Sequence, residues 1–221
     1  MTKAAVELDL ETDVHVLRAA NVGVLGHGRP LLEPTTLSVR TGEVVVVVGE
    51  PGHGHTALAL VLGGRLRADA GTVLLDDQEN DAKALQRMVA LVDVPGVSEP
   101  DDAVPLATIV GEEMSMAGLR ASRGSVHRWL EGQGIADLAD DRIDEIPAAI
   151  RTRVLAGLAA CREGVRFLVL VLPERVGGLP AAWMSTAGAL ASLGFGVLVT
   201  ASPTAAAHVD ESLLEWIGSE S

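Results

Sequence analysis

The sequence lacks several residue types on which common functions depend. Its 221 residues include one cysteine, no tyrosine and only two lysines, Lys3 and Lys83. The single cysteine, Cys161, excludes an internal disulfide and any metal site built from several cysteines. No apolar run reaches the roughly 18–20 residues of a membrane-spanning helix, and residues 1–20 are too acidic for a signal peptide. We therefore expect a cytoplasmic protein.

Basic residues are scarce as well. The chain has 17 Lys and Arg against 30 Asp and Glu, a formal charge of −13, and its acids gather in residues 76–81, 93–102 and 137–145. Such a surface repels phosphate backbones, so we expect no nucleic-acid partner. Hydrophobic residues make up 48% of the chain, which is enough for the core of one medium or two small domains.

The most informative segment is the valine run Val44–Val48 and the nine residues that follow it. These nine are Gly49, Glu50, Pro51, Gly52, His53, Gly54, His55, Thr56 and Ala57. A β-branched run predicts a buried strand, the glycines a tight loop, and the following Ala/Leu-rich segment a helix.

This layout is typical of a phosphate-binding loop, G-x-x-x-x-G-K-[ST]. In such a loop, backbone N–H groups and the helix N-terminus surround an anion, the lysine reaches the outer phosphates, and the hydroxyl binds Mg²⁺. Gly49, Gly54 and Thr56 keep the spacing, but His55 stands at the lysine position. We predict nucleotide binding by residues 49–57 with Thr56 as the Mg²⁺ ligand. A protonated His55 would restore part of the missing charge.

Alternation and turn residues predict the elements before and after this loop. Short strands are expected over Val6–Leu10 and Val14–Arg18, then a strand, glycine turn and strand over Asn21–Leu32, and one more strand from Thr36. A helix is expected over Thr56–Leu66, with Gly63 and Gly64 marking its end.

The second half of the chain predicts further helices and strands. A short helix, Ala84–Met88, precedes a buried strand, Val89–Val92. Residues 108–160 are helix-rich, with Ser125 as an N-cap and breaks at Gly132 and Gly134. The remaining expected elements are a buried strand from Val165 to Leu172, a helix over Ala181–Leu193, a strand over Gly196–Thr200 and a short amphipathic segment over Leu213–Ile217.

Taken in order, these segments resemble the ATP-binding cassette domain, the nucleotide-binding subunit of ABC transporters. The resemblance covers roughly residues 14–210. It includes the strand and turn that lead from Leu31 into the valine run, the hairpin Leu66–Asp77, the opening of a helical region at Val104–Glu113, and the strand that ends at Leu172-Pro173-Glu174 before Gly178-Leu179.

The resemblance implies an α/β, P-loop NTPase-like ABC ATPase fold, with a mixed sheet core, N-terminal antiparallel β strands and a helical subdomain. It implies a division into residues 1–104 (the β strands and the P-loop part of the core), 105–160 (the helical subdomain) and 161–221 (the remainder of the core). It also implies ATP or ADP with Mg²⁺ as ligand. The implied partners are an integral membrane protein subunit and a second cassette, in a homodimer or with a paired ABC subunit, at the inner face of the cell membrane.

Several positions depart from the family's pattern. Glu174 falls on the catalytic glutamate, but Pro173 replaces the Mg²⁺-orienting aspartate. Ile146–Ile150 replaces the serine-glycine-glycine signature, and Ser202 replaces the histidine that touches the γ-phosphate. No glutamine follows Val92.

Four further residues near these positions carry two interpretations each. Asp93, next to Val92, is either a cation ligand or an acidic loop residue. His27 is either a ring that stacks on adenine or a solvated turn residue. Arg151 and Arg153 either meet an anion or lie on a solvated helix face.

Because phosphoryl transfer depends on positioning and electrostatic stabilisation, these losses predict slow or absent hydrolysis. Our hypothesis is a degenerate cassette that binds ATP or ADP weakly and serves as a regulatory or structural partner of a membrane protein. One alternative is a nucleotide-free scaffold with the same fold. The other is an active ATPase subunit of an ABC transporter.

Overall fold

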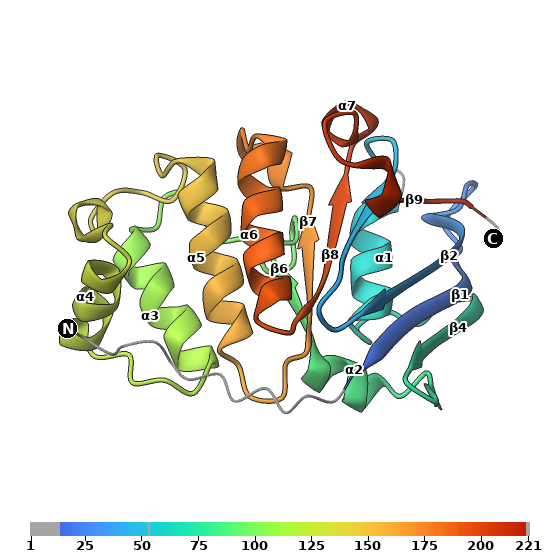
Figure 1. Ribbon diagram of the computed structural model, residues 1–221, viewed down its shortest axis with the longest axis horizontal. Helices are drawn as coiled ribbons and strands as arrows, with labels where there is room; N and C mark the ends of the chain where they lie inside the picture. The colour runs from blue at the N-terminus through green and yellow to red at the C-terminus, as the bar shows by residue number, and fades with distance from the viewer. Residues whose placement is uncertain (1–13, 53, 220–221) are drawn as a thin grey trace.

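The computed structural model describes residues 14–52 and 54–219, so the strand predicted over Val6–Leu10 lies outside the described residues (Figure 1). Two sheets organise the fold. Four antiparallel strands pair in the order β2-β1-β4-β5, and five parallel strands pair in the order β6-β7-β8-β3-β9. The predicted fold class is confirmed by this combination of antiparallel and parallel sheets with helices.

The strands of the antiparallel sheet are β1 (Val16–Val24), β2 (Leu32–Arg40), β4 (Ala70–Leu75) and β5 (Gln78–Glu79). Those of the parallel sheet are β3 (Val44–Val48), β6 (Val89–Val92), β7 (Phe167–Val171), β8 (Gly196–Ala201) and β9 (Leu214–Trp216). The α-helices are α1 (His55–Leu62), α2 (Ala82–Met88), α3 (Leu106–Met116), α4 (Arg123–Gly132), α5 (Ala148–Ala160), α6 (Pro180–Ser192) and α7 (Pro203–Ala206). Short 3₁₀ helices are η1 (Ala136–Leu138), η2 (Pro173–Val176) and η3 (Glu211–Leu213).

Both faces of the parallel sheet are buried, because successive side chains of a strand point to opposite faces. Val46 and Val48 of β3 belong to a core shared with α3, α4, α5 and α6. Val47, between them, belongs to a second core that joins the sheet to α1, α2 and the antiparallel strands. Near-continuous apolar strands such as Val44–Val48 are what a sheet covered on both faces requires.

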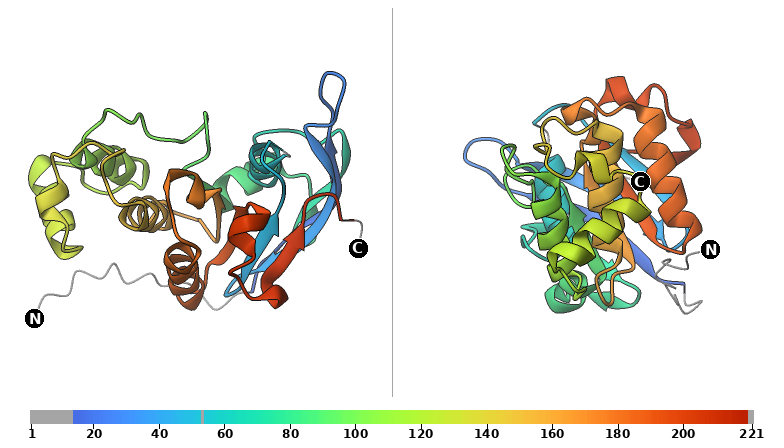
Figure 2. Two further views of the ribbon diagram at one scale, coloured as in Figure 1. Left: turned by 90° about the horizontal axis from the view of Figure 1, so that it is seen from above. Right: turned by 90° about the vertical axis from the view of Figure 1, so that its left-hand side faces the viewer.

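The helices α3, α4 and α5 gather at the end of the molecule opposite the antiparallel sheet (Figures 1 and 2). The helix α6 lies beside α5 and packs on the same core of the parallel sheet. No helix within the part of the chain that the structure describes is long and apolar enough to cross a membrane.

Several predicted elements differ in detail from the structure. The segments expected as separate strands around Val14–Arg18 and Asn21 form one strand, β1, whose register shifts near Asn21, a residue with φ of 52°. The helix α1 ends at Leu62, at the predicted glycines, four residues before the expected end.

One further prediction is corrected, and the last predicted segment is given its place in the sheet. The N-cap of α4 is Ser122, whose Oγ accepts the Ser125 N–H, so the N-cap prediction for Ser125 was wrong. The amphipathic segment Leu213–Ile217 contributes β9, which pairs with β3 at the sheet edge.

Gly71 permits the close approach of β4 to β1. Its φ is +74°, and a Cβ at this position would collide with the backbone carbonyl oxygen of Asn21. Both the backbone conformation and the contact therefore require glycine.

We expect Gly71→Ala to lower the free energy of unfolding by at least about 2 kcal/mol, because strain and collision add. The matched control is Gly188→Ala within α6, where a Cβ has open space. This change is expected to stabilise by about 0.5–1 kcal/mol, since alanine favours helix. Urea denaturation of both variants measures the difference, and equal effects would contradict the tight β1–β4 contact.

Candidate functional site

The predicted phosphate-binding loop connects the end of β3 to the start of α1. The N–H of Gly49 donates to Ala201 O at 3.1 Å, which holds the loop entrance against β8. Gly52 and Gly54 have φ of +80° and +83°, conformations that glycine adopts without strain. Gly54 is the N-cap of α1 and provides no capping side chain. The first amides of the helix therefore have no side-chain cap, as in a helix N-terminus that receives a phosphate group.

The side chain of His55 points into the loop's own backbone. It is 3% exposed, and its Nε2 lies 3.0 Å from the carbonyl oxygen of Gly49. Because a carbonyl can only accept, Nε2 is the donor in this contact. The ring also fills the space beside Gly49, where an added Cβ would lie 3.2 Å from Cε1. This nitrogen is directed at the protein instead of a ligand.

The other predicted loop residues divide into exposed and packed positions. Glu50, Pro51 and Gly52 are exposed, and Thr56 is half-buried at the first turn of α1. Ala57 packs against the core beneath the antiparallel sheet. His53 lies outside the described residues.

Glu174 and Ser202 meet at the carboxyl ends of the neighbouring strands β7 and β8. Glu174 lies in η2, and its Oε1 accepts the backbone N–H of Ser202 at 2.7 Å. Its Oε2 is buried and has no hydrogen-bond partner among the described residues. Ser202 in turn caps α7, since its Oγ accepts the Ala205 N–H. Part of the candidate carboxylate is thus engaged in positioning the loop after β8.

Asp93, at the end of β6, forms the centre of a buried ion cluster that the sequence did not predict. Arg151 Nε and Nη2 donate to its two carboxylate oxygens at 3.0 and 2.9 Å. Arg175 Nη2 donates to Asp93 Oδ1 at 2.8 Å and to Glu99 Oε1 at 3.1 Å. The side chains of Arg151 and Asp93 are 3% and 9% exposed. Asp93 is therefore an ion-pair partner within the protein, and a cation would have to compete with two guanidinium groups.

The interpretation of Arg151 as part of a solvated helix face was wrong, and the anionic group that it contacts is the Asp93 carboxylate. Arg151 is buried, whereas Arg153 is exposed, because positions two apart on a helix point in different directions. Burial, the largest single influence, lowers the pKa of Arg151. The hydrogen bonds and charge of Asp93, with the charges of Asp102 and Glu99, outweigh it, so the pKa of Arg151 is raised overall. The sequence signals for this cluster were an arginine inside the apolar helix α5 and the acidic residue directly after β6.

The residues at the carboxyl-terminal edge of the parallel sheet fit a phosphate better than a divalent cation. Thr56 supplies one hydroxyl, Pro173 has no carboxylate, and Asp93 is neutralised by arginines. No group of three or more His, Cys, Asp or Glu side chains suited to a metal ion occurs within residues 14–52 and 54–219. Mg²⁺ prefers near-octahedral oxygen coordination with one or two carboxylates. The loop therefore suits an anion, and the metal ligand set is deficient.

Two further predicted positions offer little to a ligand. The segment Ile146–Ile150 begins α5 with Pro147 at the N-cap and without a capping side chain, and Ile146 is buried in the core. His27 lies exposed in the turn between β1 and β2.

Comparisons with known proteins agree with this geometry. The family model described as ABC transporter matches residues 32–160, more than half of the chain. The phosphonates import ATP-binding protein PhnC 2 of Albidiferax ferrireducens is 33% identical over 156 residues, which cover 64% of this chain and 56% of the relative. The taurine import ATP-binding protein TauB of Sinorhizobium fredii is 31% identical over 159 residues, covering 71% and 57%. The chain spans about half the length of these two curated relatives.

Solved structures share the fold. A nucleotide-free ATP-binding cassette from an ABC transporter aligns with a TM-score of 0.65 at 18% identity, covering 92% of this chain and 87% of that one. A bacterial Atm1-family ABC exporter with ATP bound aligns with a TM-score of 0.59 at 20% identity, covering 87% and 35%. At these identities the likeness concerns the fold alone.

We expect Asp93→Ala to lower the free energy of unfolding by about 3–5 kcal/mol, because it leaves the buried Arg151 guanidinium without its partner. The control is Asp144→Ala, which removes the ion pair between Asp144 and Arg142. These two side chains are 39% and 50% exposed, respectively. This loss is expected to cost about 0–1 kcal/mol. Denaturant unfolding measures both, and similar values would contradict a buried cluster.

Proposed function

Because this chain belongs to the ABC transporter family, we propose that it is a nucleotide-binding-type subunit that binds ATP or ADP weakly, with little or no hydrolysis. The observation that carries the proposal is the inward His55, whose Nε2 donates to Gly49 O. A loop that retains its glycine conformations but directs this nitrogen at its own backbone offers phosphates mainly amide groups. Such a site retains affinity for anions and lacks the fixed outward cation of a full phosphate-binding loop.

Three features support slow or absent turnover. Pro173 stands where the family holds its metal aspartate, Asp93 is paired with Arg151 and Arg175, and Glu174 Oε1 accepts the Ser202 N–H. Loss of one electrostatic contributor typically costs about 10²–10³ in rate. The ligand set at this site does not fit Mg²⁺, so the site lacks the metal that would orient the attacking water.

The partners and the location are proposed on the same basis. The relatives named above are import ATP-binding proteins by their names. We propose that this chain serves as a regulatory or structural partner of an integral membrane protein at the cytoplasmic face of the membrane. It would pair there with a second copy or another cassette.

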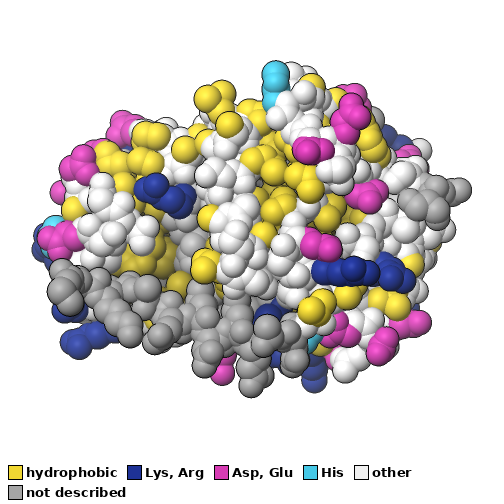
Figure 3. Space-filling view, viewed as in Figure 1, with side chains coloured by type: hydrophobic (Ala, Val, Ile, Leu, Met, Phe, Trp, Pro, Cys, Tyr) yellow, Lys and Arg dark blue, Asp and Glu magenta, His cyan; other side chains and the backbone are white. Residues whose placement is uncertain are grey.

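The division into residues 1–104, 105–160 and 161–221 is part of the same proposal. The gathering of α3, α4 and α5 at one end of the molecule supports it. On the face of Figure 3, acidic side chains are scattered over the rim and the right half, and basic ones form small separate groups. This charge distribution favours protein partners over nucleic acid.

A nucleotide-free scaffold is favoured by one observation. The space beside Gly49 is filled by the His55 ring and by Ile217, whose Cδ1 would lie 2.8 Å from an added Cβ. In the scaffold alternative this packing closes the loop to phosphates, and the protein acts by binding partner proteins without nucleotide.

Replacement of His55 tests nucleotide binding directly. We expect His55→Lys to strengthen Mg²⁺-ATP binding by about 10-fold or more, because a charged donor then reaches the phosphates. We expect His55→Ala to change the affinity by less than about threefold, since a single neutral hydrogen bond that avoids the ligand contributes little. Isothermal titration of wild type and both variants, with thermal unfolding to confirm folding, measures this.

The pH dependence separates the alternatives. Affinity that rises from pH 8 to pH 6 and loses this rise in His55→Ala would show an outward, protonated ring and contradict the inward arrangement. Absence of binding in the wild type and in His55→Lys, both folded, would favour the nucleotide-free scaffold.

Glu174→Gln tests catalysis. We expect any ATP hydrolysis by the wild type to stay within about twofold in this variant, because the side chain positions Ser202 and lacks a metal-held reaction partner. A glutamine oxygen still accepts the Ser202 N–H, so stability should fall by no more than about 1 kcal/mol. Steady-state phosphate release is the measurement, with Glu215→Gln as a control on the edge strand β9. A loss of about 10²-fold or more would establish the active-ATPase alternative.

A further inference from the structure

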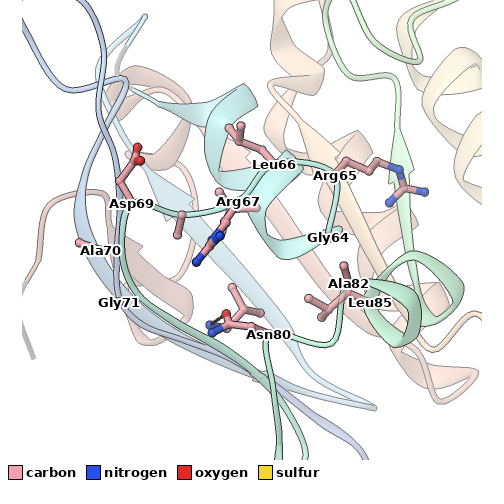
Figure 4. Close-up of a pocket in the computed structure, with 13 residues that line it drawn as sticks. Gly64, Arg65, Leu66, Arg67, Asp69, Ala70, Gly71, Asn80, Ala82 and Leu85 are labelled. Atoms are coloured by element: carbon pink, nitrogen blue, oxygen red, sulfur yellow. Dashed lines mark hydrogen bonds between the residues drawn. The ribbon is translucent and has the colours of Figure 1, made fainter.

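A second site lies at the other end of α1. A cavity of about 590 Å³, partly open to solvent, is lined by the residues that follow α1, by β4 and by the start of α2 (Figure 4). This volume lies within the range of small-molecule sites, about 300–1,000 Å³. The phosphate-binding loop is at the N-terminus of α1, roughly 12 Å away along an eight-residue helix. The cavity is therefore separate from the nucleotide site.

One wall of the cavity is apolar. Val61, Val73 and Leu85 line it and are buried in the core beneath the antiparallel sheet, and Leu66 packs against the same core. These side chains come from α1, β4, α2 and the loop after α1, so the wall is fixed by elements of the core. It offers a firm surface to the apolar part of a ligand.

The polar side chains around the cavity differ in whether they already have partners. Arg65 Nη1 donates to Gly63 O at 2.8 Å and to Val89 O at 3.4 Å, and its guanidinium extends away from the cavity. Asp69 Oδ2 accepts the Leu25 N–H at 2.8 Å. Both side chains are therefore engaged in holding the surrounding backbone.

Arg67 is different. Its side chain is exposed at the rim of the cavity and forms no hydrogen bond or ion pair with any of residues 14–52 and 54–219. Figure 4 shows its guanidinium directed across the cavity toward Asn80. In a chain with 30 acidic and 17 basic residues, an arginine without an acidic partner presents a donor fork that matches carboxylate or phosphate oxygens.

Asn80 completes the arrangement. Its Oδ1 accepts the Val73 N–H at 3.0 Å, which fixes the amide and leaves its nitrogen as a pair of donors. Two exposed donor groups thus lie on facing sides of the cavity, whose lining also includes the Asp69 carboxylate that accepts from Leu25. An anionic group placed there would accept from both.

We propose that this cavity binds a small organic anion, a carboxylate or phosphate ester with an apolar body. Its anionic group bridges Arg67 and the Asn80 amide, and its apolar body lies against Val61, Val73 and Leu85. The site requires neither a metal nor nucleotide, so it goes beyond the function proposed above.

The probes are hexanoate and hexyl phosphate, titrated into the full chain by isothermal titration. We expect dissociation constants on the order of 1 mM. Inorganic phosphate, which lacks the apolar body, and hexanol, which lacks the anionic group, should each bind at least about fivefold more weakly. Arg67→Gln should weaken hexanoate binding about 10-fold or more. Asn80→Asp keeps the acceptor for Val73 and replaces the donor with a negative oxygen, so it should weaken binding similarly.

Matched controls locate the site. Arg18→Gln removes an exposed arginine of β1 that does not line the cavity, and Thr56→Ala alters the phosphate-binding loop. Both should retain wild-type affinity for the probes. Amide chemical-shift changes on adding hexanoate should map to residues 64–71 and 80–85.

Three results would overturn the proposal. One is no shift change at about 10 mM probe, where a millimolar ligand fills most sites. The second is binding that Arg67→Gln leaves unchanged in a folded protein. The third is shift changes confined to residues 49–57 with affinity lost in Thr56→Ala, which would place the anion in the nucleotide loop. Since the probes need no nucleotide, failure of ATP binding leaves this test intact.

Discussion

Burial of the parallel sheet on both faces determines where the chemistry of this protein lies. Alternate side chains of β3, β6, β7 and β8 enter two separate cores, so these strands cannot shift register without moving apolar side chains into the wrong core. All parallel strands then end at the same edge, and the loops after them are brought together. Residues far apart in the sequence, such as Glu174 and Ser202, meet there because their strands are neighbours.

At this edge, the protein satisfies its charges internally. Arg151 lies near the N-terminus of α5, and Asp93 directly follows β6. Their bidentate pair therefore ties the helical end of the molecule to the sheet. A cation that recruited Asp93 would have to break a buried pair, and leaving a buried charge without its partner costs about 3–5 kcal/mol. The same cluster that anchors α5 therefore opposes metal binding, which connects the fold to the predicted loss of hydrolysis.

Much of the fold was predictable because its signals are local. The valine run and the glycines after it each specify backbone conformation within a few residues, and they were placed correctly. The hairpin Leu66–Asp77, expected from the family resemblance, covers β4 and the turn after it but ends before β5. One missed feature depends on a distant partner. The counter-ion of Arg151 is 58 residues away in the sequence. Two other missed features are local but depend on the exact backbone geometry: the inward direction of His55 depends on where the Gly49 carbonyl lies, and the choice of Ser122 over Ser125 as cap depends on where the helix begins.

The two ends of α1 differ in what they offer an anion. The N-terminal end provides backbone amides and a helix dipole, whose interaction with a charge is worth about 0.3–1 kcal/mol at exposed sites. The loop beyond the C-terminal end provides the guanidinium of Arg67, whose hydrogen bonds to a charged group are worth about 1.5–3 kcal/mol. A simple organic anion should therefore favour the cavity, whereas a polyphosphate, which can accept from several loop amides at once, should favour the N-terminal end. With both proposed sites occupied as described, the chain would separate two kinds of anion by the number of acceptors each one carries.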